Sequence, residues 1–472
     1  MTPLPAPRGR QAHVVHLSSD RHNVVLGTAG TGKSTMAMLR AVHLARPSTV
    51  NSGPVLVVTY NNTLVKYLRF LGPEARSNIT IETYSRFARG YLAHRGFMPN
   101  NAIAGPDAVR ELVESALDAV ARDWSSRSVD PGSVAARHSD WFTDELHWIS
   151  GMGLAAEDDY QRVNRVGRQT ALQTGQPRAF VWAVRSEYVR RRAAAGLVYD
   201  WYDIASSVRN GLATDASHRR YRHIIIDEGQ DLSPEAIRSL TAAIQPGGSL
   251  TFFGDYHQAI YGQGLSWRSS GIRLDGRPVE RFVDNYRNTA EVARVAIAMA
   301  QSSYMRSGDL DLVEPVQPTA AGPKPALSRY PDPRAEAAAI RDLAAELGKD
   351  QTVGILVRTR ADVTTVGRNL PHRLLHARMQ RWDEAPGVYL GTYHSAKGLE
   401  FDTVIMPFLN DDSVPYPDVL RAFAEDEACS REAKLLYVSI TRARAGLILT
   451  HSGRLSRLLP ENAGLWSERD LT

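Results

Sequence analysis

The chain has 472 residues, of which 43% are hydrophobic and 23% are charged, and its formal net charge is +5. This length predicts two or three domains, and the composition excludes collagen-like, disordered and membrane-embedded classes. No apolar run approaches the roughly 18 residues of a membrane-spanning helix, and the first ten residues lack the apolar core of a signal peptide. The single cysteine, Cys429, excludes an internal disulfide, so we expect a reducing, cytoplasmic location.

Apolar stretches of strand length alternate with amphipathic helical patterns at both ends of the chain. The stretches are rich in Val, Ile and Leu without alternation, which is typical of parallel strands buried on both faces. The predicted strands are 23–26, 55–59, 223–227, 250–253, 353–357, 388–391 and 404–407. With a helix predicted over 334–347, the pattern indicates an α/β fold with parallel sheets.

Residues 89–210 differ from both ends, because they have helical spacing and few strand-like runs. We interpret them as a helical insertion in the first α/β domain, and the proline-containing segment 306–327 as a connector. Within the insertion, residues 162–192 hold eight arginines and one acid, Glu187, with aromatic residues between them. This composition suits a phosphate backbone and stacked bases, and a solvated helix face is the alternative.

A phosphate-binding loop is predicted directly after the first strand. Residues 27–34 read GTAGTGKS, which fits G-x-x-x-x-G-K-[ST] between a strand and a helix. Backbone amides of such a loop close around a phosphate, and the helix N-terminus adds partial positive charge. We expect Lys33 to reach the β- and γ-phosphates of ATP and Ser34 to hold Mg²⁺. The predicted nucleotide-binding residues here are Gly27, Thr28, Ala29, Gly30, Thr31, Gly32, Lys33, Ser34 and Thr35.

Two acids complete the pattern of a nucleotide hydrolase. Asp227 and Glu228 directly follow the apolar run 224–226. A carboxylate at a strand end can hold Mg²⁺, and its neighbour can take a proton from an attacking water. Such a pair is common by itself, but together with the phosphate-binding loop it predicts a hydrolytic site.

Further motif-like segments follow one another along the chain. Gln11 lies 16 residues before Gly27. The other segments are 55–62 (VLVVTYNN), 83–87 (TYSRF), 227–231 (DEGQD), 254–261 (GDYHQAIY), 285–287 (NYR), 392–401 (TYHSAKGLEF) and 436–444 (LYVSITRAR). In this order they resemble the motifs of the UvrD/Rep/PcrA-like superfamily 1 helicases, from about residue 11 to residue 449, and Gln11 has the spacing of that family's adenine-reading glutamine.

The resemblance implies two RecA-like domains with ATP in the cleft between them. Residues 1–88 and 211–284 would form the first domain, 89–210 its helical insertion, and 285–472 the second domain. Asp227 and Ser34 would hold Mg²⁺, and Glu228 would be the general base.

The family also implies residues that respond to the γ-phosphate. Gln258 would sense it, while Arg287 and Arg442 would act as arginine fingers from the second domain. Glu400 would contact the nucleotide ribose or bridge to the DNA site. Fixed cations at these places would stabilise the charge that develops on the transferred phosphoryl group.

Strand-binding residues are likewise implied by the resemblance, and their aromatic rings would stack bases without reading sequence. The predicted set is Thr59, Tyr60, Asn61, Thr83, Tyr84, Ser85, Tyr261, Trp267, Thr392 and His394. For Tyr60 and Tyr84 the alternative is packing at a strand end. The resemblance also places the arginine-rich segment 162–192 beside the DNA path, which favours its interpretation as a DNA contact.

Asp231 and the triplet 432–434 allow interpretations other than a role in nucleotide hydrolysis. Asp231 is interpreted as a helix cap, and the nuclease-like triplet at 432–434 is set aside for want of a suitable acid upstream.

Arg287 and Thr392 are 105 residues apart, which leaves no room for the large second accessory subdomain of full-length relatives. The sequence therefore predicts translocation more firmly than duplex unwinding.

Three functions remain open from the sequence. The first is an ATPase that moves 3′ to 5′ on single-stranded DNA and can unwind duplex. The second is a regulatory ATPase subunit that senses DNA and controls a separate nuclease, for example in DNA repair or anti-phage defence. The third is RNA-directed remodelling, because stacking and phosphate contacts do not exclude RNA.

Overall fold

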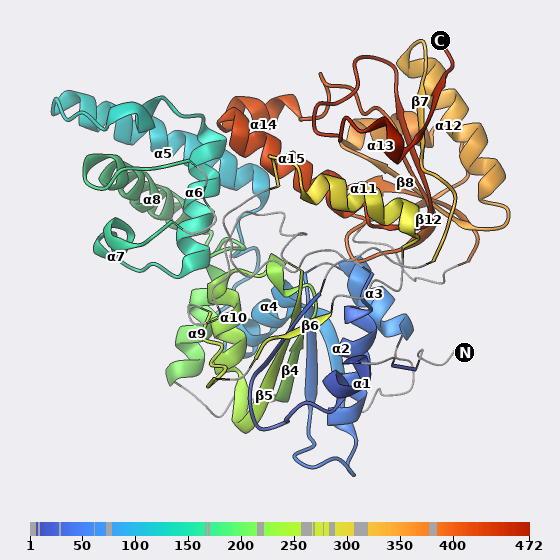
Figure 1. The fold of residues 1–472 in the computed structure, drawn as a ribbon. Helices are drawn as coiled ribbons and strands as arrows, with labels where there is room; N and C mark the ends of the chain where they lie inside the picture. The colour runs from blue at the N-terminus through green and yellow to red at the C-terminus, as the bar shows by residue number, and fades with distance from the viewer. Residues whose placement is uncertain are drawn as a thin grey trace.

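The computed structural model describes residues 6–7, 10–27, 30–60, 62–71, 78–165, 168, 170–214, 221–255, 267, 270–276, 278–282, 288–305, 320–376 and 385–472. They form two α/β lobes, one above the other in Figure 1, and a helical arm at one side of both. Among these residues, no helix combines the length and the apolar character needed to cross a membrane.

The first lobe is built on a six-stranded sheet in the order β3-β2-β4-β5-β1-β6, in which every pair is parallel. Its strands are β1 (Asn23–Gly27), β2 (Val55–Thr59), β3 (Ile79–Thr83), β4 (Tyr221–Ile226), β5 (Ile244–Gly254) and β6 (Glu280–Phe282). Its helices are α1 (Arg10–Val15), α2 (Lys33–Ala45), α3 (Asn62–Leu71), α4 (Tyr84–His94), α9 (Ile204–Thr214) and α10 (Pro234–Ala242). The four strands predicted for this half are confirmed, while β3 and β6 were not predicted.

The second lobe is built on a seven-stranded parallel sheet in the order β13-β7-β12-β11-β8-β10-β9. Its strands are β7 (Ala326–Arg329), β8 (Thr352–Val357), β9 (Arg373–Leu374), β10 (Gly387–Thr392), β11 (Phe401–Met406), β12 (Ala443–His451) and β13 (Ser467–Asp470). Its helices are α11 (Ala290–Ala300), α12 (Pro333–Leu347), α13 (Arg360–Gly367), α14 (Pro417–Ala422) and α15 (Glu425–Ile440). The predicted α/β fold with parallel sheets is thus confirmed.

The helical arm comprises α5 (Pro106–Ser126), α6 (Ser139–Met152), α7 (Glu157–Arg162) and α8 (Gln176–Ala194). It has a core of its own, in which Trp141, Phe142, Trp148 and Phe180 are almost fully buried. The described part of 89–210 contains no named strand, as the helical pattern predicted. Figure 1 shows the arm beside α10 of the first lobe and α14 and α15 of the second.

Part of the arginine-rich segment of the arm is buried and does not form the DNA-facing surface that was predicted. Arg165, Arg178 and Arg192 are buried. Arg165 forms an ion pair of 2.6 Å with Glu145, and Arg192 pairs with Asp200 at 2.9 Å. Arg178 donates to backbone carbonyls of the arm. The interpretation as a DNA contact is wrong for these three, because their charges are used within the arm.

Arg40 of α2 connects three parts of the first lobe, although the sequence did not single it out. It is fully buried. Its guanidinium donates to the carbonyls of Leu17 at 2.9 Å and Ser18 at 3.0 Å, just after α1, and to Thr251 Oγ1 of β5 at 2.7 Å. A buried cation that satisfies several acceptors holds α1 against α2 and the sheet.

We predict that Arg40→Met lowers the free energy of unfolding by about 3 kcal/mol, because several buried acceptors lose a charged donor. The measurement is denaturant unfolding compared with wild type. Arg46→Met, at the exposed C-terminus of the same helix, is the control and should change little. Equal stability of the two variants would contradict the assignment.

Candidate functional site

The phosphate-binding loop joins the carboxyl end of β1 to the first turn of α2. Gly32 has φ 79°, a left-handed conformation that favours glycine, and a Cβ there would lie 2.9 Å from Gln11 Nε2 and displace it. Lys33 Nζ donates to the Gly27 carbonyl at 2.7 Å and lies 3.6 Å from Asp255 Oδ2. This lysine ammonium therefore lies at the mouth of the loop, where a phosphate would meet it.

Gln11 also reaches this loop. It is buried on α1, and its Nε2 donates to the Thr31 carbonyl at 3.0 Å. The predicted adenine-reading residue is thus adjacent to the phosphate-binding loop. Ser34 and Thr35 lie in the first turn of α2 and are partly exposed.

Asp227 follows β4 at the same sheet edge. It is fully buried, and neither carboxylate oxygen forms a hydrogen bond within the described residues. Burial and then the adjacent Glu228 raise the pKa of Asp227 to about 7, although the nearby Ser34 hydroxyl and Lys33 act in the opposite direction. Two buried carboxylate oxygens without partners, with a hydroxyl close by, fit the oxygen ligands that Mg²⁺ prefers.

Glu228 has the character that a general base needs. Its backbone is left-handed, with φ 55° and ψ 44°, which is strained for a residue with a side chain. Burial disfavours its charge, but Lys33, Lys397 and Arg442 outweigh burial and hold the pKa of Glu228 below its usual value. The carboxylate is therefore ionised and able to accept a proton.

Gln230 orients this carboxylate, a role the sequence did not reveal. Its Nε2 donates to Glu228 Oε2 at 2.6 Å, and its Oε1 accepts from the backbone N–H of Asp255 at 2.8 Å. The amide thus joins the segment after β4 to the end of β5. Its place within DEGQD was the available signal.

The second lobe meets the first at these carboxylates. Lys397, between β10 and β11, forms a buried ion pair with Asp231. The prediction that Asp231 is a helix cap is wrong, because Ser233 caps α10 and accepts from Ala236 N–H at 3.2 Å. Burial raises the pKa of Asp231 to about 6, against the opposing effect of Lys397.

Arg442 also approaches the motif from the second lobe. It lies just after α15, is buried, and donates to the Val438 carbonyl at 2.8 Å. Its charge lowers the pKa of both Glu228 and Asp231. The structure therefore brings the predicted arginine finger close to the predicted base.

Glu400 lies elsewhere in the second lobe, where its Oε2 is 3.2 Å from Arg444 Nε. Its role toward ribose or DNA stays a prediction. Several other predicted site residues lie outside the described residues: Thr28, Ala29, Asn61, Gln258, Tyr261 and Arg287.

The predicted strand-binding residues fall into two groups. Tyr60 and His394 are exposed, and Ser85 and Thr392 are partly exposed. They lie where β2, β3 and β10 end, so these carboxyl ends of parallel strands present accessible groups.

The other described members serve packing. Thr59 is fully buried, and Thr83 caps α4 by accepting from Arg86 N–H at 3.2 Å. Tyr84 is buried, and its hydroxyl hydrogen-bonds with Ser239 Oγ at 2.7 Å. Its ring is therefore not available to stack on a nucleic-acid base. Trp267 packs edge-to-face on Phe252, with ring centroids 4.7 Å apart.

The fold and this site together define a nucleoside triphosphatase with a phosphate-binding loop and two α/β lobes. The family description "UvrD/REP helicase N-terminal domain" matches residues 8–274, and "UvrD-like helicase C-terminal domain" matches residues 371–454. The chain belongs to the UvrD/Rep helicase family. It is therefore an ATP-dependent enzyme of the superfamily 1 DNA helicase class.

Individual relatives agree with this membership. The ATP-dependent DNA helicase UvrD2 of Mycobacterium tuberculosis is 25% identical, over 90% of this chain and 76% of its own. DNA helicase IV of Escherichia coli is 22% identical, over 92% of this chain and 66% of its own. The ATP-dependent DNA helicase PcrA of Staphylococcus aureus is 38% identical, over 16% of this chain and 10% of its own.

We predict that Asp227→Asn abolishes ATP hydrolysis and yet raises the free energy of unfolding by about 2 kcal/mol at pH 8, because burial and the adjacent Glu228 disfavour the charge that the substitution removes. Folding raises the pKa of Asp227 from 3.8 to about 7, so the folded state favours the proton. The ionised carboxylate therefore lowers the free energy of unfolding by its full amount above pH 7, and by less as the pH falls toward 4. The stability gained by the variant decreases over the same pH range.

Denaturant unfolding at pH 8 and pH 5, without nucleotide, measures this difference. Asp350→Asn changes an exposed aspartate and should leave stability unchanged at both values. A stability loss for Asp227→Asn at pH 8 would show that the carboxylate has a stabilising partner in the protein itself.

Proposed function

We propose that this protein hydrolyses ATP to move 3′ to 5′ along single-stranded DNA, with Mg²⁺ held by Asp227 and Ser34. The convergence of charges between the lobes carries the proposal. Glu228 and Asp231 from the first lobe face Lys397 and Arg442 from the second. A site divided between two lobes links their separation to the state of the nucleotide.

Each residue has a definite task in this proposal. Bound Mg²⁺ would screen the phosphate charges. Lys33 would hold the terminal phosphates, and ionised Glu228, oriented by Gln230, would take a proton from the attacking water. Arg442, which now donates to a carbonyl of its own lobe, would turn toward the transferred phosphoryl group as its charge grows.

The proposed domains follow the two sheets and the arm. Residues 1–88 and 211–284 would form the first RecA-like domain, and their described part contains β1 to β6. Residues 89–210 would form the inserted domain, and 285–472 the second RecA-like domain with β7 to β13.

The proposed DNA path follows the carboxyl ends of the strands in both lobes. Tyr60 and Ser85 lie there in the first lobe, and Thr392 and His394 in the second. Because Tyr60 presents an exposed ring, stacking with a base is available without sequence preference. Because both lobes would contact the DNA, opening and closing of the cleft between the lobes would move the DNA strand.

We predict that single-stranded DNA stimulates ATP hydrolysis and that Lys33→Ala lowers kcat by at least about a hundredfold, since a cation facing the phosphates is lost. Steady-state ATPase assays with and without oligonucleotide measure this. Lys349→Ala, an exposed lysine paired with Glu346 on α12, should behave as wild type.

Matched substrates decide between the functions. Unwinding or displacement on 3′-tailed but not 5′-tailed DNA supports the polarity. Stronger stimulation by RNA of the same sequence would favour RNA remodelling. Hydrolysis that is insensitive to both nucleic acids would refute the proposal, and hydrolysis only in the presence of a nuclease would favour a regulatory subunit.

We predict that Tyr60→Ala weakens single-stranded DNA binding about tenfold, because one base loses its stacking partner. Fluorescence anisotropy of a labelled oligonucleotide at fixed salt measures this. Tyr84→Phe removes only the hydroxyl that bonds to Ser239 and should leave DNA affinity unchanged. If both variants bind as wild type, the proposed path does not include Tyr60.

A further inference from the structure

Helix α6 of the arm contacts both lobes. At its C-terminal end, the Met152 carbonyl accepts a hydrogen bond from Arg238 of α10. The next residue, Gly153, lies so close to Glu235 of α10 that a Cβ there would be 2.4 Å from the carboxylate. Asp144, eight residues before Met152, contacts α15 of the second lobe. About 12 Å of helix therefore separates the two attachments.

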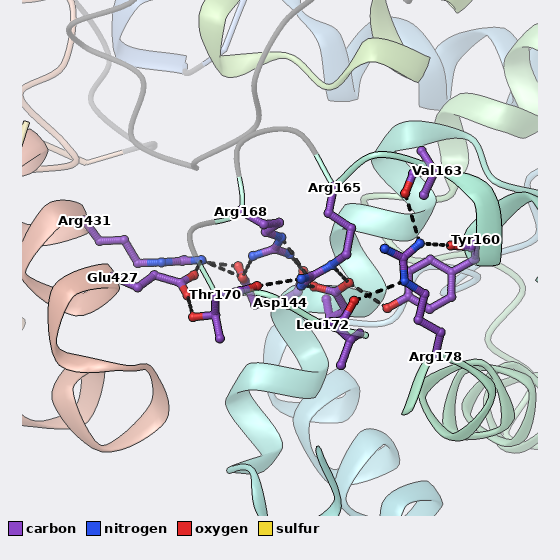
Figure 2. A network of polar contacts seen from close by, with 11 residues as sticks. Asp144, Tyr160, Val163, Arg165, Arg168, Thr170, Leu172, Arg178, Glu427 and Arg431 are labelled. Carbon is purple, nitrogen blue, oxygen red and sulfur yellow. Dashed lines mark hydrogen bonds and ion pairs between the residues drawn. The ribbon is translucent and has the colours of Figure 1, made fainter. Parts of the chain in front are cut away.

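The contact with α15 is an ion-pair network, drawn in Figure 2. Arg431 donates to both oxygens of Asp144, from Nη2 at 2.7 Å and from Nη1 at 3.3 Å. Arg168 of the arm pairs with the same carboxylate. Glu427, one turn before Arg431, accepts from Arg431 at 2.8 Å and from Thr170 of the arm. We call the pair Asp144–Arg431 the arm latch.

The arm latch is more than a surface ion pair. The side chains of Asp144 and Arg431 are only 27% and 19% exposed. Phe423, just before α15, packs against the core of the arm, and the Arg431 guanidinium lies 4.0 Å from its ring centroid. Burial opposes the charge of Asp144, but Arg168 and Arg431 hold its pKa well below the usual range. Solvent and salt screen a partly enclosed charged pair less than an exposed one.

The two helices that α6 connects carry the two halves of the candidate catalytic site. Helix α10 begins at Pro234, three residues after Asp231, and so follows the carboxylate segment directly. Helix α15 ends at Ile440, two residues before Arg442. A rigid helix that is fixed to both therefore limits how far Arg442 can lie from Glu228.

We propose that Asp144 and Arg431 are positioning residues, which hold α15 against α6 so that Arg442 is placed toward Glu228. The proposal rests on the function proposed above and adds residues that touch neither nucleotide nor DNA. In this proposal the arm affects ATP hydrolysis indirectly, because it fixes the position of the second lobe relative to the first. A merely structural role would instead affect melting alone.

The test compares Asp144→Asn, Arg431→Gln and the double variant in ATPase assays at saturating single-stranded DNA. We expect each single change to lower kcat by about tenfold, since small misplacements of a catalytic group are costly, with KM for ATP nearly unchanged. The double variant should be no slower than the slower single variant, because both changes break one interaction. Arg431→Lys, which keeps the charge, should recover part of the rate.

Arg421→Gln is the matched control, since Arg421 pairs with Asp418 within α14 and both are exposed. It should keep the wild-type kcat. Circular dichroism and melting confirm that each variant is folded at the assay temperature. Wild-type kcat in both folded single variants, or rate losses that multiply in the double variant, would overturn the proposal.

Small-angle X-ray scattering gives a readout that does not depend on hydrolysis. Breaking the latch should increase the radius of gyration of the free protein, because the second lobe loses the ion pair that fixes α15 to α6 and keeps only the Thr170–Glu427 and Phe423 contacts with the arm. Unchanged scattering for Arg431→Gln would overturn the proposal even if its activity falls. Absence of DNA-stimulated hydrolysis in wild type, by contrast, would refute the proposed function while scattering still tests the latch.

Discussion

Burial of several carboxylates at one sheet edge is the constraint on which the rest of the structure depends. Three acids within five residues of chain are buried: Asp227, Glu228 and Asp231. A buried negative charge is costly unless cations lie close to it. The first lobe supplies Lys33, and the second supplies Lys397 and Arg442. The cations that offset Glu228 and Asp231 therefore come from both lobes, which ties the lobe arrangement to the chemistry.

Buried charges in the arm also have nearby partners of opposite charge. Some of its arginines lie inside the protein, where Arg165 and Arg192 have acids as partners. One acid, Asp144, is shared between the arm and the second lobe. An arginine fork can satisfy several acceptors in a fixed plane, which makes it suited to joining helices. Part of the arginine content of the segment thus serves assembly of the arm and its attachment.

Local patterns were predicted from sequence, and long-range partnerships were not. The phosphate-binding loop and the acids after β4 were found because their chemistry requires neighbouring residues. Strand β3 was missed because ITIET alternates polar and apolar residues at the sheet edge and does not form an apolar run. The role of Asp231 was misassigned because its partner, Lys397, is 166 residues away. No local pattern carries such a pairing, since only the assembled lobes create it.

The position of the arm within the first lobe also sets an order of assembly. Strand β2 pairs with β4 through Val55 and His223, and β1 pairs with β5 through Asn23 and Thr251. The central strands of this sheet thus come from both sides of the inserted helices, whereas the arm has a separate core of nearby helices. Local contacts form faster than distant ones. During synthesis the arm can therefore fold while β1, β2 and β3 still lack their central neighbours, and the hydrolytic site is completed last.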